Sequence, residues 1–68
     1  MEVRQLTNRV AEIRKERGIS QEELAEKAGI SRPYLSKIET SRQDVVGSKV
    51  MFAIAEALGA KYEEIFLP

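Results

Sequence analysis

The stretch from residue 19 to residue 39, ISQEELAEKAGISRPYLSKIE, decides how this chain folds. Ser20, with Glu23 three residues later, has the spacing of a capping box, which satisfies free amides at the start of a helix. Gly29 ends that helix, because glycine readily adopts the left-handed conformation that closes a helix. Ser31 can cap a second helix in the same way as Ser20 caps the first. The stretch therefore predicts two short helices joined by a tight turn.

Two short helices that meet at a glycine, the second capped by serine, form the pattern of a helix-turn-helix. Ala25 and Ala28 are small enough to let the second helix cross the first closely, and Ile30 follows the turn as an apolar plug. Pro33 falls in the first turn of the second helix, where its missing N–H costs little. That helix then presents its N-terminal turn and one polar face to the major groove of DNA.

On the N-terminal side of this stretch, apolar residues recur at the three- and four-residue spacing of an amphipathic helix. Leu6, Val10 and Ile13 form one apolar stripe, and charged residues fill most of the remaining positions. Gly18 is the stop signal, and it follows basic residues that suit the negative end of the helix dipole. A first helix is therefore expected to end at Gly18.

On the C-terminal side, residues 40–48 are polar without a helical period and are typical of a loop. Ser48 can cap a fourth helix, which stays apolar as far as Gly59, and residues 61–66 form one last short helical turn. No alternating pattern of a β-strand appears. We therefore expect an all-α fold, a compact bundle of four to five short helices, in a single domain spanning residues 1–68.

Composition excludes several classes of protein. The 68 residues include no cysteine and no histidine, which removes disulfides, thiolate metal sites and the usual general base. No apolar run approaches the roughly 20 residues needed to span a bilayer, and the N-terminus lacks the apolar core of a signal peptide. We expect a cytoplasmic domain that is not an enzyme, without cofactor, metal, membrane contact or small-molecule ligand.

The charge balance is neutral overall, with 11 basic and 11 acidic residues. Neutrality argues mildly against nucleic acid, because attraction to phosphates supplies most non-specific affinity. The basic surplus nevertheless lies in residues 1–42 and the acidic surplus in residues 43–68. The electrostatic field on one face, and not the net charge, determines whether a protein attracts DNA, so DNA binding stays open.

Residues 19–39 resemble the lambda-repressor/Cro-like helix-turn-helix family, also called the XRE family. The resemblance rests on Ser-Gln at a helix start and on Leu-Ala, Ala-Gly-Ile-Ser and Ile-Glu at the family's spacing. It continues through residues 54–59, IAEALG, and residues 63–66, EEIF, and so covers roughly residues 5–67. It implies a lambda-repressor-like DNA-binding domain.

The resemblance implies that Gln21 contacts a phosphate and buttresses the third helix, while Arg32, Pro33 and Lys37 face base edges. Tyr34 either packs against Pro33 or the first helix, or contacts the DNA backbone. The segment that follows departs from the family, since Thr-Ser replaces the usual Asn-Gly after Ile-Glu. The expected DNA-binding residues are Gln21, Ser31, Arg32, Pro33, Tyr34, Ser36, Lys37, Ser41 and Arg42.

The fourth helix is apolar nearly all round, which indicates a helix that is either buried or partnered. Its core face consists of Met51, Ile54, Ala55 and Leu58. A domain this small lacks the bulk to bury the edges of that face as well, and family members often dimerise through the surface after the recognition helix. We therefore expect a homodimer through residues 48–67, with Val50, Phe52 and Phe66 in the interface.

These features predict a sequence-specific transcriptional regulator, most simply a repressor, that binds a palindromic operator in double-stranded DNA as a homodimer. Two alternatives stay open. One is a protein-binding module, such as the antitoxin of a toxin–antitoxin pair. The other is the controller protein of a restriction–modification operon, which has the same fold.

Overall fold

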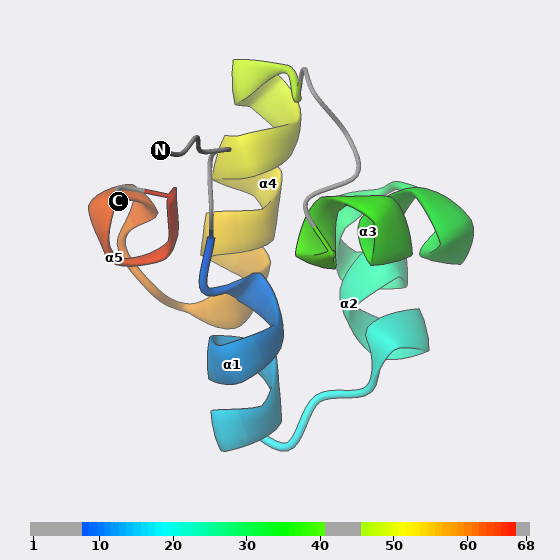
Figure 1. Ribbon diagram of the computed structural model, residues 1–68, viewed down its shortest axis with the longest axis horizontal. Helices are drawn as coiled ribbons and strands as arrows, with labels where there is room; N and C mark the ends of the chain where they lie inside the picture. Colours follow the sequence, from blue (N-terminus) through cyan, green and yellow to red (C-terminus); the bar gives the residue numbers. More distant parts are fainter. Residues whose placement is uncertain (1–7, 41–45, 67–68) are drawn as a thin grey trace, which may run out of the picture.

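The computed structural model describes residues 8–40 and 46–66, which form five helices and no strand (Figure 1). The all-α prediction is therefore confirmed for this part of the chain. The predicted apolar contact of Leu6 lies outside the described residues. The helices are α1 (Val10–Glu16), α2 (Gln21–Ala28), α3 (Arg32–Glu39), α4 (Ser48–Leu58) and α5 (Tyr62–Phe66).

The two serine caps of the helix-turn-helix form as predicted. The Ser20 hydroxyl accepts the amide N–H of Glu23 at 3.0 Å, and the Ser31 hydroxyl accepts that of Tyr34 at 3.2 Å. Between the two helices Gly29 has a φ of 74°, in the left-handed region that glycine reaches without a steric penalty. The turn thus follows from local sequence.

The cap predicted for α4 is wrong by one residue. Gly47 is the N-cap, with φ −61° and ψ 145°, and Ser48 is the first helical residue. An N-cap needs this extended backbone, so a serine that already lies inside the helix cannot accept from the first free amides. α4 therefore begins without a side-chain cap.

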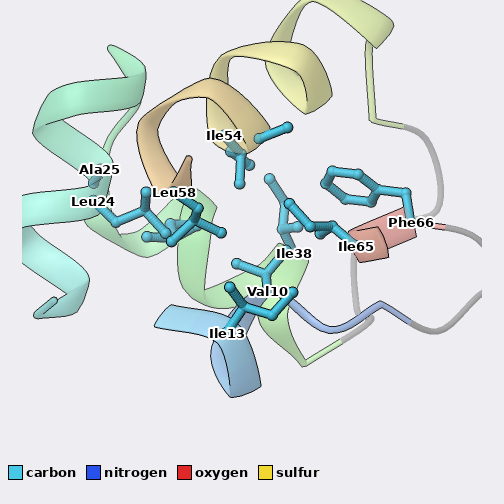
Figure 2. Close-up of a cluster of buried hydrophobic side chains, with 11 residues drawn as sticks. Val10, Ile13, Leu24, Ala25, Ile38, Ile54, Leu58, Ile65 and Phe66 are labelled. Carbon is cyan, nitrogen blue, oxygen red and sulfur yellow. The ribbon is translucent and has the colours of Figure 1, made fainter. Parts of the chain in front are cut away.

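α4 runs through the middle of the molecule, with α2 and α3 on one side and α5 on the other (Figure 1). All five helices contribute side chains to one apolar core, which Figure 2 shows. The predicted core residues Ile54, Ala55 and Leu58 are buried, and Met51 is half-buried against the same cluster. The buried residues are Val10, Ile13, Leu24, Ala25, Leu35, Ile38, Ile54, Ala55, Leu58, Ile65 and Phe66.

The start of α1 is tied to α5. The amide N–H of Arg9 donates to the carbonyl oxygen of Ile65 at 2.8 Å. The Arg9 side chain pairs with Glu12 on the surface, with 3.1 Å between Nε and Oε1. This hydrogen bond and the guanidinium charge lower the pKa of the Glu12 carboxyl, and the same contact raises the pKa of Arg9. Both ends of the described chain are thus joined at one face.

We expect Gly47→Asp to raise the free energy of unfolding by about 0.5–1 kcal/mol, because it supplies the missing cap and restricts the unfolded chain. The backbone of Gly47 already has the conformation of an N-cap, and an added Cβ meets no atom within 4 Å. Urea denaturation followed by circular dichroism measures the change.

Gly29→Ala is the matched control, since an added Cβ there also meets no atom within 4 Å. Its φ of 74° is nevertheless left-handed, and an alanine in that conformation should cost about 1–2 kcal/mol. The two glycine substitutions should therefore change the free energy of unfolding in opposite directions. A destabilised Gly47→Asp domain would contradict the N-cap at Gly47.

Candidate nucleic-acid interface

α3 is amphipathic, and its two sides have different surroundings. Leu35 and Ile38 are buried in the core, and α3 packs directly on α2. Arg32 and Lys37 are exposed on α3 and supply two cations to the surface. Tyr34 is half-buried and packs against the core cluster.

A largely buried ion pair connects the end of α3 to α1. The Glu39 side chain, at the end of α3, is 5% exposed, and that of Arg14, on α1, is 13% exposed. Arg14 donates from Nε to Oε2 of Glu39 at 2.8 Å and from Nη2 to Oε1 at 3.3 Å. Its Nη1 donates to the carbonyl oxygen of Ile19 at 3.0 Å. The guanidinium therefore joins α1, the loop before α2, and α3.

Gln21 links this ion pair to the exposed face. Its Nε2 donates to Oε1 of Glu39 at 3.0 Å, and its Oε1 accepts from Nη1 of Arg32 at 3.4 Å. Since Glu39 ends α3 and Arg32 begins it, the Gln21 amide contacts both ends of the helix. The side chain that the resemblance assigns to buttressing α3 lies in contact with it.

The end of α3 is satisfied without a left-handed residue. Thr40 has a φ of −96°, and its hydroxyl donates to the carbonyl oxygen of Ser36 at 2.9 Å. The Asn8 side chain donates to the carbonyl oxygen of Ile38, also at 2.9 Å. The last carbonyls of a helix need partners from outside the helix, and here two side chains supply them.

The structure brings most of the expected DNA-binding residues onto the α2 start and α3. Ser31 and Pro33 are exposed at the first turn of α3, and Ser36 is half-buried one turn later. Ser41 and Arg42 lie outside the described residues, so their expected contacts with DNA stay predictions.

The expected dimer residues divide between surface and core. Phe52 is 58% exposed, Val50 is half-buried, and Phe66 is 5% exposed within the core cluster. Tyr62 contacts both phenylalanines edge to face, with ring centroids 4.8 Å from Phe52 and 5.5 Å from Phe66. Since Phe66 packs into the core, the aromatic surface of this region consists mainly of Phe52 and the half-buried Tyr62.

Sequence reasoning missed three residues of this arrangement. Asn8 was not singled out, and Arg14 was only one of the basic residues before Gly18 that suit the dipole of the first helix. Glu39 was recognised as part of the Ile-Glu motif without a partner. The local sequence carried no signal for these contacts, because Glu26 and Glu56 also follow buried residues directly and are nevertheless exposed.

Across residues 8–40 and 46–66, no helix is long and apolar enough to cross a membrane. In the same described segments, no cluster of acidic side chains has the arrangement of a metal site.

The fold and this surface define a helix-turn-helix domain, the class of the helix-turn-helix transcriptional regulators. A family model described as helix-turn-helix matches residues 10–65, and the chain belongs to this family, of the lambda-repressor-like XRE type.

The proteins that are similar to this chain include a phage repressor, a restriction–modification controller and a biofilm regulator. The immunity repressor protein of Bacillus phage phi105 is 46% identical over 84% of this chain and 39% of its own length. The restriction–modification controller protein C.AhdI from Aeromonas hydrophila has a TM-score of 0.78 and 32% identity, over 82% of this chain and 83% of its own. A structure of the biofilm regulator SinR in complex with DNA has a TM-score of 0.75 and 36% identity, over 81% and 87%.

We expect Glu39→Ala to lower the free energy of unfolding by about 3–5 kcal/mol, because it leaves the largely buried Arg14 guanidinium without its anion. Lys27→Ala is the control, since Lys27 pairs with Glu23 on the surface at 3.8 Å. That change should cost no more than about 0.5 kcal/mol. Urea denaturation of both variants provides the comparison. Equal free energies of unfolding for the two variants would mean that solvent, and not Glu39, compensates the charge of Arg14.

Proposed function

We propose that this chain represses transcription by binding a palindromic operator as a homodimer, with the first turn of α3 in the major groove. The observation that carries the proposal is the way α3 is held. Its apolar side is buried, its ends are joined to α1 and α2 by side chains, and Arg32 and Lys37 remain exposed. A helix fixed in this way presents its cations in one geometry.

Arg32 is the residue best suited to read a base. A guanidinium can donate two parallel hydrogen bonds to guanine O6 and N7 in the major groove, the commonest specific contact between proteins and DNA. Gln21 uses one donor of Arg32 and leaves the others available. Lys37, one turn further along, reaches either a base or a phosphate. The SinR structure with DNA and the phage immunity repressor support this role by their similarity.

The homodimer rests on the aromatic surface formed by Phe52 and Tyr62. Phe52 is the one large apolar side chain that is strongly exposed in the described residues. The Tyr62 hydroxyl contacts the sulfur of Met51 at 3.7 Å, which holds the ring against α4. Burial of a phenylalanine side chain stabilises by roughly 1.5–3 kcal/mol, and two-fold symmetry applies this gain twice. Val50 lies on the same helix and extends the surface.

A second candidate function is that of a controller protein of a restriction–modification operon. The similarity to C.AhdI favours it, because the two chains match over most of both lengths. Both candidates need the same DNA-reading face and differ in the genes that the operator controls. An inverted repeat upstream of restriction–modification genes would favour the second.

We expect Arg32→Ala to weaken operator binding by about 1–3 kcal/mol and to relax specificity at one base pair of each half-site. The loss of a bidentate contact removes discrimination at that position only. Selection of binding sites from random DNA, followed by titration of matched and single-mismatch duplexes, measures both effects. Uniformly weaker binding to every sequence would identify Arg32 as a phosphate contact and contradict its assignment to a base.

We expect Phe52→Glu to convert the dimer to a monomer while the helical content stays largely intact, because the exposed ring is not part of the core. Affinity for a palindromic operator should fall far more than for the loss of one base contact, since one particle no longer holds both half-sites. Sedimentation and operator titration measure the two effects.

Phe52→Leu is the matched control, because it keeps an apolar side chain at the same position and should remain dimeric. Unfolding of the Phe52→Glu domain would place Phe52 among the residues that support the core. A dimer that survives the glutamate would locate the interface elsewhere.

A further inference from the structure

One side chain joins the start of α1 to the end of α3. Oδ1 of Asn8 accepts the amide N–H of Val10 at 3.0 Å, and Nδ2 donates to the carbonyl oxygen of Ile38 at 2.9 Å. Val10 and Ile38 are both buried, and Asn8 itself is half-buried. The Asn8 side chain therefore contacts a backbone carbonyl that lies 30 residues further along the chain.

Asparagine is the residue that fits this position chemically. Its amide combines an acceptor oxygen with a nitrogen that carries two donor hydrogens. Aspartate offers acceptors only, and the serine hydroxyl sits one atom closer to the backbone. Since Val10 donates and the Ile38 carbonyl accepts, the two contacts fix which side of the Asn8 amide faces each helix.

The Asn8 contact lies beside the other attachment of α3 to α1. Asn8 holds Ile38, and Arg14 holds Glu39, the next residue. The main direct packing of α3 is against α2. α3 can tilt about this contact, and two polar attachments in its last turn oppose the tilt.

The length of α3 makes a small tilt important at the DNA-reading end. Six residues separate Ile38 from Arg32, which corresponds to about 9 Å along a helix at 1.5 Å per residue. A tilt of about 10° at the last turn would therefore displace Arg32 by about 1.5 Å, enough to break a hydrogen bond with a usual length of roughly 2.7–3.2 Å.

We propose that Asn8 is a positioning residue that sets the tilt of α3, and through it the sequence preference of the DNA-reading face. The second part rests on the proposed function. Asn8 does not touch DNA in this proposal. It acts through the carbonyl of Ile38, and its loss changes the ratio of specific to non-specific binding more than it changes the fold.

Two variants separate this role from the contact of Asn8 with the Val10 amide. Asn8→Ser and Asn8→Asp both keep an oxygen that can accept from Val10, and both lose the donor to Ile38. Serine adds no charge, so it excludes simple repulsion from phosphates. The unchanged protein, which carries Asn8, is the reference.

We expect both variants to keep their helical content by circular dichroism. For Asn8→Ser, operator affinity should fall about threefold to tenfold, as for the loss of one hydrogen bond, while affinity for unrelated DNA stays within twofold. The reason is that phosphate attraction does not depend on the angle of one helix. Residual dipolar couplings should show α3 rotated relative to α1 and α2 in both variants.

Three outcomes would overturn the proposal. An unchanged direction of α3 in both variants would show that the Arg14–Glu39 pair alone sets the tilt. A rotated α3 with an unchanged ratio of specific to non-specific affinity would show that the tilt does not govern sequence preference. Loss of helical content in both variants would show that Asn8 is needed for folding and not specifically for the direction of α3. Failure of the unchanged protein to bind any duplex contradicts the proposed function instead, and the dipolar couplings still decide the tilt.

Discussion

The arrangement of the first three helices depends on how the Glu39 carboxylate is satisfied. This side chain is 5% exposed, and an unpaired charge in that position would cost several kcal/mol. Arg14 supplies two donors and Gln21 a third. Because a buried ion pair contributes little net stability, its consequence is geometric. α1, α2 and α3 cannot shift separately without leaving a buried charge unpaired.

This constraint matters most for α3, which has only eight residues. An isolated helix of that length is marginal in water, so its direction comes from its neighbours and not from its own propensity. The core holds its apolar side, while Asn8 and Arg14 hold its end and Gln21 contacts Arg32 at its start. General attraction to phosphates carries no sequence information, so any preference for a DNA sequence has to come from such fixed placement.

What the sequence could predict was local. Ser20, Gly29 and Ser31 determine caps and a turn within four residues, and the structure has all three as expected. Ser48 failed as a cap because the start of α4 depends on where the preceding loop turns, which the cap residue does not encode. The partners of Asn8 and Glu39 lie 30 and 25 residues away, and only the packed core brings them together. Phe66 belongs to a five-residue helix, too short for a hydrophobic period to show which side faces inward.

α4 connects the two surfaces that the proposed function needs. Ile54 and Leu58 on one side pack into the same core as Leu24 of α2 and Leu35 of α3. Phe52, on another side of the same helix, contacts Tyr62 and leaves its ring mostly exposed. Protein interiors are packed about as densely as organic crystals, so a displacement of α4 has to be transmitted to α2 and α3. In the proposed dimer the two DNA-reading helices are therefore set at a fixed separation by a continuous packed core. The spacing of the half-sites becomes a property of the fold, and the identity of the bases read remains a property of the first turn of α3.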